Sequence, residues 1–207
     1  MQLLEHSWRR AWSALHTEPA HGLFKQLVAC YREAHRRYHT LQHLSECLEK
    51  LEPVLGRAEH PGEVEVALWF HDAIYAVKRQ DNEQQSALWA KRALASAGYS
   101  AEGLARVYSL IMATRHSALP QTADERLLVD IDLSILGATA ERFAEYGRQV
   151  RQEYAWVPDW LFWRKRKAIL QEFMARQSIY GTEHFYRQYE AQARQNLEHA
   201  LASARNT

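Results

Sequence analysis

The sequence predicts an all-α protein. Apolar residues recur at helical spacing along nearly all of the 207 residues, and the alternation typical of strands is nearly absent. Glycine and proline, with 8 and 5 copies, are too scarce to mark many strands and turns. No linker-like segment, low-complexity stretch or internal repeat divides the chain. We therefore expect one helical domain over residues 1–207, with roughly eight to ten helices joined by short connections.

The first half of the chain predicts five helices. Pro19 can open the second, because a helix tolerates proline in its first turn, and Thr40 can cap the third with its hydroxyl. Asp81 and Asn82 can cap the fifth, which should end at Gly98. The expected extents are residues 4–15, 19–31, 40–55, 63–72 and 81–97, with a polar, mostly charged connection at 32–39.

The second half predicts five more helices. Ser100 can open the sixth and Thr139 the eighth, since both hydroxyls suit the position that caps a helix. The seventh should cover residues 127–136 and close at Gly137. Pro158 is expected to begin the ninth helix, and Thr182 to cap the last.

The composition is that of an ordinary globular protein, with 47% apolar and 25% charged residues and a formal net charge of +1. Neither half is strongly basic or acidic, so we expect no nucleic acid and no membrane as a partner. No apolar segment resembles a signal peptide or a membrane span, which predicts a cytoplasmic protein that can form homo-oligomers. The two cysteines, Cys30 and Cys47, form no CxxC pattern, so neither disulfides nor a thiolate zinc site are expected.

The segment 67–75 has apolar residues on both sides of the pair His71 and Asp72. A charged aspartate in such surroundings needs compensation, because an unpaired buried charge costs several kcal/mol or more. A salt bridge or a capping role would supply it. A divalent metal would also do so, with an imidazole nitrogen and a carboxylate oxygen as ligands.

Two other segments carry groups that could complete a metal site. His39 and His43 are four residues apart, and a cap at Thr40 places His43 in the first turn of its helix, facing inward. Asp130 and Asp132 interrupt the apolar segment 127–136. Taken singly, these residues are equally well explained as surface histidines and a buried ion pair.

Four of these residues form a plausible ligand set from three helices. Two imidazoles and two carboxylates suit Mg, Mn, Fe or Zn and leave coordination positions for water. The set consists of His43, His71, Asp72 and Asp132.

These motifs resemble the HD superfamily of metal-dependent phosphohydrolases. Tyr-His-Thr-Leu-Gln-His at 38–43 resembles the Tyr-His-Asn-x-x-His motif of cyclic-nucleotide phosphodiesterases in that superfamily, with Thr40 in place of Asn. Asp-Leu-Ser at 132–134 resembles a segment of the same enzymes. Segments 69–75, 81–87 and 130–137 are similar to a bacterial group of predicted HD phosphohydrolases. The resemblance covers most of the chain.

The resemblance implies that His43, His71, Asp72 and Asp132 bind a metal and that His39 is the general acid. The expected reaction is hydrolysis of a phosphate ester, either a monoester or a diester, by a metal-activated water that Asp72 can orient. The substrate would be a nucleotide or a related small phosphorylated metabolite. The further histidines of cyclic-nucleotide phosphodiesterases are missing, so cyclic nucleotides are not inferred. Two alternatives remain: a di-iron oxygenase with the HD fold, and a non-catalytic ligand-binding module that contains a metal.

Other polar residues are weaker candidates. Arg115 and His116, after the sixth helix, could bind the substrate phosphate or simply face solvent. Asp81 and Glu83 could hydrogen-bond the metal ligands or bind a second metal, although capping a helix is the simpler role. Asp130 is expected to hydrogen-bond a metal ligand or to form an ion pair, rather than to bind the metal itself. The basic segment 164–167 could bind an anion, but a solvated helix face is the simpler interpretation.

Overall fold

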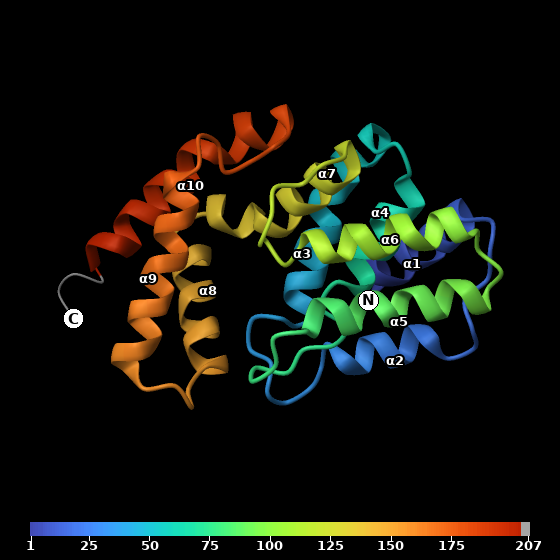
Figure 1. The fold of residues 1–207 in the computed structure, drawn as a ribbon, viewed down its shortest axis with the longest axis horizontal. Coiled ribbons are helices and arrows are strands. Elements are labelled where there is room, and N and C mark those ends of the chain that lie inside the picture. The colour runs from blue at the N-terminus through green and yellow to red at the C-terminus, as the bar shows by residue number, and fades with distance from the viewer. Residues whose placement is uncertain (204–207) are drawn as a thin grey trace. The chain divides into compact units, whose positions relative to one another are not determined.

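The computed structural model describes residues 1–203, and this part of the chain contains ten α-helices, two short 3₁₀ helices and no strand (Figure 1). The all-α prediction is confirmed. The described residues group into two compact units, Met1–Ile131 and a second that begins at Asp132, and the expectation of one domain stays a prediction. None of the helices within residues 1–203 combines the length and apolar character that crossing a bilayer demands.

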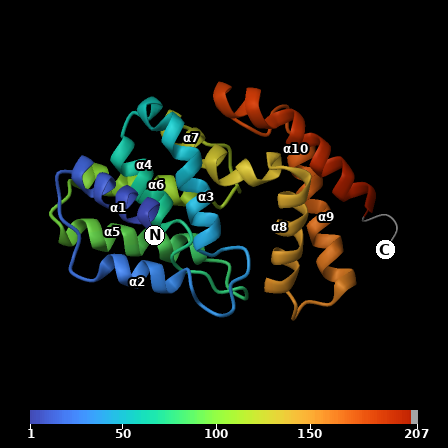
Figure 2. The ribbon, with the colours of Figure 1, turned by 180° about the vertical axis from the view of Figure 1, so that it is seen from behind.

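The first unit is built around α4 (Pro61–Phe70), of which every residue from Gly62 to Phe70 is buried. Four helices pack against it: α1 (Gln2–Ala14), α3 (Leu41–Leu51), α5 (Asn82–Ser96) and α6 (Ala101–Ala113). Figures 1 and 2 both show α5 beside α6, and α2 (Leu23–Cys30) on the other side of α5. The pair His71 and Asp72 directly follows α4. Because α4 is the central helix, the pair lies in the interior of the unit.

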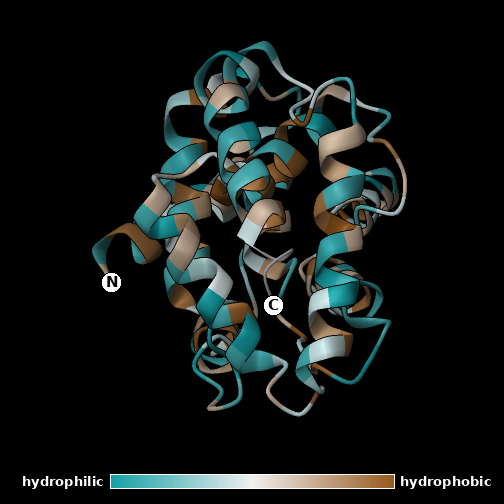
Figure 3. Ribbon diagram, turned by 90° about the vertical axis from the view of Figure 1, so that its left-hand side faces the viewer, coloured by the Kyte–Doolittle hydropathy of each residue, from teal (hydrophilic) through white to brown (hydrophobic). Residues whose placement is uncertain are grey.

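The helices α1 and α3 beside α4 are amphipathic. Figure 3 shows that hydrophilic and hydrophobic residues are interspersed along the helices of the chain. In α3 the buried residues recur at the spacing of one helix face. His43 and Cys47 belong to that buried face together with leucines 44, 48 and 51. The same pattern that packs α3 therefore turns the imidazole of His43 toward the core.

A buried carboxylate fixes α1 against α4. Glu65 accepts a hydrogen bond of 2.6 Å from the Ser7 hydroxyl and bonds of 3.0 and 2.6 Å from Nε and Nη2 of Arg10. Ser7 in turn accepts a 3.0 Å bond from the indole nitrogen of Trp69. These bonds compensate the buried charge. They also hold Trp69, two residues before His71, in one position.

Several helix boundaries differ from the prediction because of prolines and glycines. The second helix begins at Leu23 rather than Pro19, after Gly22, whose φ of 81° only glycine adopts without strain. Thr40 caps α3 as expected, accepting a bond from the Gln42 amide. However, α3 ends at Leu51, and η1 (Glu52–Arg57), a 3₁₀ helix, follows with Pro53 near its start.

The helix predicted over residues 127–136 is displaced toward the N-terminus. The α-helix α7 covers Ala123–Asp132, and the following residues form the 3₁₀ helix η2 (Leu133–Gly137). The apolar pattern missed the first turn because its buried residues, Asp124 and Glu125, are acidic. Asp124 is compensated by the backbone amides of Glu59 and His60, which donate bonds of 2.7 and 3.0 Å to its carboxylate.

The second unit contains η2, α8 (Ala140–Glu153), α9 (Asp159–Ala175) and α10 (Glu183–Ser203). Thr139 caps α8, as predicted. The side-chain amide of Asn196 on α10 donates bonds of 2.8 and 2.9 Å to the carbonyls of Leu136 and Ala138. A side chain at Gly137 would lie 2.6 Å from Cβ of Tyr189, so glycine permits this close packing. Figures 1 and 2 show α8 and α9 side by side as a hairpin.

Candidate metal centre

Three of the predicted ligands meet in the first unit. Nε2 of His43, on α3, lies 3.2 Å from Nε2 of His71, which directly follows α4. Oδ2 of Asp72 lies 3.0 Å from Nε2 of His71 and 3.5 Å from Nε2 of His43. Ligand atoms about 2.1 Å from a shared ion lie about 3.0 Å apart at right angles and about 3.4 Å apart at tetrahedral angles. The spacing of the three atoms therefore matches one face of a metal coordination sphere.

The orientation of His71 also suits a ligand. Its Nδ1 lies 2.7 Å from the carbonyl oxygen of Leu68, which can only accept a hydrogen bond, so Nδ1 carries the proton. In neutral His71 the lone pair of Nε2 then faces the Asp72 carboxylate. Two such acceptors repel one another unless a proton or a cation lies between them. Backbone bonds of this kind are how proteins orient histidines that bind metals.

The electrostatic surroundings keep Asp72 ionised. Burial raises the pKa of the Asp72 carboxyl, but the imidazoles of His71, His39 and His43 lower it by more, so it lies below its usual range. A carboxylate that stays charged near neutral pH is available as a ligand. The buried charge in the apolar segment 67–75 is thus compensated by the adjacent His71 and by His43 and His39, from α3 and the loop before it.

Sequence reasoning missed Cys47. Its donor atom and those of His43 and His71 all lie within 4.8 Å of one another, and the side chain is buried. Its sulfur lies 3.7 and 3.8 Å from the two ring nitrogens of His43, so it is directed at neither lone pair in particular. The Asp72 oxygen lies closer to the imidazole nitrogens and is the better third ligand. The spacing of four residues from His43 is the signal that could have identified Cys47.

The remaining aspartates of the motif lie at the end of α7. Asp130 is buried, and Asp132 is the last residue of the helix. Because the second unit begins at Asp132, its role as a ligand remains a prediction, as does the supporting role of Asp130.

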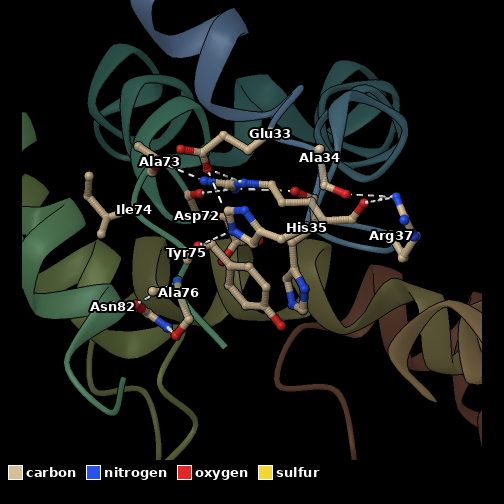
Figure 4. Close-up of polar contacts among 12 residues, drawn as sticks. Glu33, Ala34, His35, Arg37, Asp72, Ala73, Ile74, Tyr75, Ala76 and Asn82 are labelled. Atoms are coloured by element: carbon tan, nitrogen blue, oxygen red, sulfur yellow. Dashed lines mark hydrogen bonds and ion pairs between the residues drawn. The ribbon is translucent and has the colours of Figure 1, made fainter. Parts of the chain in front are cut away.

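A buried arginine ties the loop before α3 to the end of α4. Arg36 donates bonds of 2.6 Å to the carbonyl of Asp72, 3.0 Å to that of Ala73 and 3.2 Å to that of His39. Its Nε donates a 2.9 Å bond to Glu33. Figure 4 shows Glu33, Asp72 and Ala73 gathered where these bonds meet. One guanidinium thus holds the backbone of a candidate ligand, Asp72, and of the candidate acid, His39.

His39 lies beside the candidate ligands. Its ring stacks on Tyr75 with centroids 4.0 Å apart and meets Tyr38 edge-on at 4.9 Å. Its centroid is 6.1 Å from that of His43, and the ring is partly exposed. Aromatic packing on two sides restricts the ring to one orientation. The ring therefore lies next to the candidate ligands and is partly open to solvent, and its role as proton donor stays a prediction.

Asp81, predicted to cap α5, binds side chains instead. Its carboxylate accepts bonds of 2.7 and 2.6 Å from Arg79 and one of 2.9 Å from the side-chain amide of Gln85. The hydrogen bonds from Arg79 and Gln85 lower the pKa of Asp81 to about 2. Asn82 instead holds the loop by bonding both N and O of Ala76, as Figure 4 shows. Asp81 therefore occupies the N-cap position of α5, as predicted, but its side chain makes no capping hydrogen bond.

The other weak candidates belong to segments of the chain other than those that carry His43, His71 and Asp72. Glu83 is in the first turn of α5. Arg115, which is exposed, and His116, with a φ of 54°, follow α6. Their proposed roles stay predictions. A second group of possible ligands, Glu59, His60 and Asp124, is explained by the backbone bonds to Asp124 and by the 3.0 Å contact between the His60 ring and that carboxylate.

We expect Arg36→Lys to weaken metal binding by about 10–100-fold, the usual effect of changing a group that orients a ligand. Lysine cannot bond three carbonyls in the fixed geometry of a guanidinium. Titration of the metal-free protein with Zn²⁺ or Mn²⁺ in a calorimeter measures the affinity. Arg37→Lys, at the exposed neighbouring position, is the matched control and should change little. A folded Arg36→Lys variant with unchanged metal affinity would show that Arg36 does not position the ligands.

Comparison with protein-family models, with curated proteins and with solved structures finds no match to this chain.

Proposed function

We propose that the protein is a metal-dependent phosphohydrolase of the HD type, acting on a phosphate ester of a nucleotide or a related small metabolite. The observation that carries the proposal is the group of Nε2 of His43, Nε2 of His71 and Oδ2 of Asp72, separated by 3.0–3.5 Å. Asp132 is the fourth proposed ligand on the basis of the sequence motif. The HD resemblance and this spacing agree on the first three residues.

The donor set fits a hard or borderline divalent ion such as Mg, Mn, Fe or Zn. A bound ion would supply a water nucleophile at neutral pH and offset charge on the phosphoryl oxygens. The chain's own residues do the rest. His71, which keeps its proton on Nδ1, can offer the lone pair of Nε2, and Nε2 of His43 lies 3.2 Å from that atom. Asp72 contributes negative charge and an oxygen that can also orient the water.

His39 is the proposed proton donor to the leaving oxygen. Histidine titrates near neutral pH, so a protonated ring is available in a useful fraction of molecules. The stack on Tyr75 and the Arg36 bond to the His39 carbonyl hold the ring and its backbone. A donor held in place beside the ligands can reach the ester oxygen without binding the metal itself.

The test is a metal analysis of the purified protein combined with a panel of phosphomonoesters and phosphodiesters. We expect a bound divalent ion, and hydrolysis of at least one ester that stops after chelation and returns when the metal is restored. Hydrolysis that continues undiminished in the metal-free protein would contradict the proposal. Two bound irons with a charge-transfer absorption band, and no hydrolysis, would favour the di-iron oxygenase.

A further inference from the structure

The loop before α9 and the first turns of that helix expose large apolar residues. Trp156, Trp160 and Trp163 are 53%, 66% and 40% exposed. Of the seven large apolar residues in this exposure class within residues 1–203, four lie between positions 156 and 169. Single exposed apolar residues are normal in soluble proteins, whereas a concentration of them marks an interaction surface.

Cations follow the tryptophans on the same helix. Trp160, Trp163, Arg164 and Lys167 have the spacing that places four residues on one side of a helix. We call this set the α9 face. The guanidinium carbon of Arg164 lies 5.3 Å from the centre of the Trp160 ring. Since the whole chain has a net charge of only +1, the cations at 164–167 are a local concentration.

Arg151 holds the loop that carries Trp156. It donates bonds of 2.6 and 3.0 Å to the carbonyls of Tyr154 and Val157, and its Nε donates a 3.0 Å bond to Asp159. Its guanidinium also lies over the Phe162 ring at 4.7 Å. The tryptophans are thus presented by a constrained turn. The negative charge of Asp159 is paired with Arg151, so it does not cancel the cations of the α9 face.

We propose that the α9 face docks on the surface of an anionic lipid bilayer. Indole rings favour the headgroup region, where their apolar body is buried while the ring N–H stays hydrated. Arginine and lysine extend their charges to the lipid phosphates, with apolar stems alongside the indoles. A single-stranded nucleic acid is the less suitable occupant, because single strands bind in grooves that follow their backbone and this face is the outer side of one helix.

The proposal is independent of the metal centre and replaces our expectation of no membrane partner. That expectation rested on the net charge of the whole chain, which averages over the surface. A bilayer responds only to charges within roughly one Debye length, about 8 Å at physiological ionic strength. The two cations of the α9 face, Arg164 and Lys167, therefore matter more than the chain average.

The test measures sedimentation of the full-length protein with lipid vesicles. Vesicles of phosphatidylcholine alone are compared with vesicles that also contain phosphatidylglycerol. We expect binding only to the anionic vesicles, and quenching of tryptophan fluorescence when the lipids carry brominated chains. Removing the charges of Arg164 and Lys167 should weaken binding by about 30-fold or more, from the usual contribution of two basic residues near an anionic surface.

Three variants separate the possible explanations. Arg164→Glu/Lys167→Glu and Trp160→Ala/Trp163→Ala should both lose vesicle binding. Lys91→Glu/Arg92→Glu, with the same charge change on exposed positions of α5, should retain it. Circular dichroism of each variant confirms folding. The proposal is overturned if the α9 charge variant and the α5 charge variant bind anionic vesicles equally well. It is also overturned if the protein binds a single-stranded oligonucleotide more tightly than vesicles, or if it self-associates and both α9 variants abolish the self-association.

Discussion

The variant His71→Ala is expected to lose metal binding and phosphohydrolase activity together. His71 supplies the nitrogen that lies within 3.2 Å of both the His43 nitrogen and the Asp72 oxygen, and its ring is fixed by the carbonyl of Leu68. Changing a residue that merely supports a ligand costs about 10–100-fold in metal affinity, so loss of the ligand itself should exceed about 100-fold. Metal content after dialysis and calorimetric titration measure this loss.

Thermal unfolding gives a second measurement that does not require a substrate. A ligand present at about 100 times its dissociation constant stabilises the folded protein by about 2.7 kcal/mol, so added metal should raise the Tm of the natural protein. The rise should disappear in His71→Ala. His60→Ala is the matched control, because His60 also contacts a carboxylate but belongs to the second group of possible ligands. A full metal-dependent rise in His71→Ala would contradict the proposed centre.

The variant His39→Gln should lower turnover by about 10²–10⁴-fold and leave metal content unchanged, because general acid catalysis contributes that much. Glutamine keeps a polar side chain of similar size but has no proton that titrates near neutral pH. Turnover is measured on the best alkyl phosphate ester identified in the panel. Metal analysis of the same sample shows whether the change is confined to proton donation.

The leaving group provides an internal control for this prediction. A p-nitrophenolate departs without a proton, so hydrolysis of a p-nitrophenyl ester should be nearly insensitive to His39→Gln. The high-pH limb of the rate profile with the alkyl ester should also disappear in the variant. Full activity of His39→Gln on the alkyl ester, or loss of metal from this variant, would show that His39 is not the acid.

Local sequence was sufficient for features that depend on a few neighbouring residues. Thr40, Ser100 and Thr139 cap their helices as predicted, because a hydroxyl at that position bonds amides only two or three residues away. His43, His71 and Asp72 were also chosen correctly as residues that come together in the first unit. A charge inside an apolar segment needs a partner wherever it lies, so the sequence could indicate the pair before its surroundings were known.

Features that depend on distant segments could not be read from the sequence. A proline can lie in the first turn of a helix or precede the helix. Pro19 precedes it, because the second helix begins only after Gly22, whose backbone is left-handed. Asp81 is the N-cap residue of α5, as predicted, but its carboxylate bonds Arg79 rather than a backbone amide of the helix. The split into two units at Asp132 leaves no mark in composition, because the division lies at the end of a helix without a linker.

The sequence by itself determined that this protein is helical, that α3 turns His43 inward, and which residue types could bind a metal. Only the tertiary structure decided that the His43 and His71 nitrogens and the Asp72 oxygen lie 3.0–3.5 Å apart, that Cys47 is beside them and that Arg36 bonds the carbonyls behind them. The physical reason is one of range. Caps and periodicity act within one or two turns, whereas ligand spacing depends on how whole helices pack around α4.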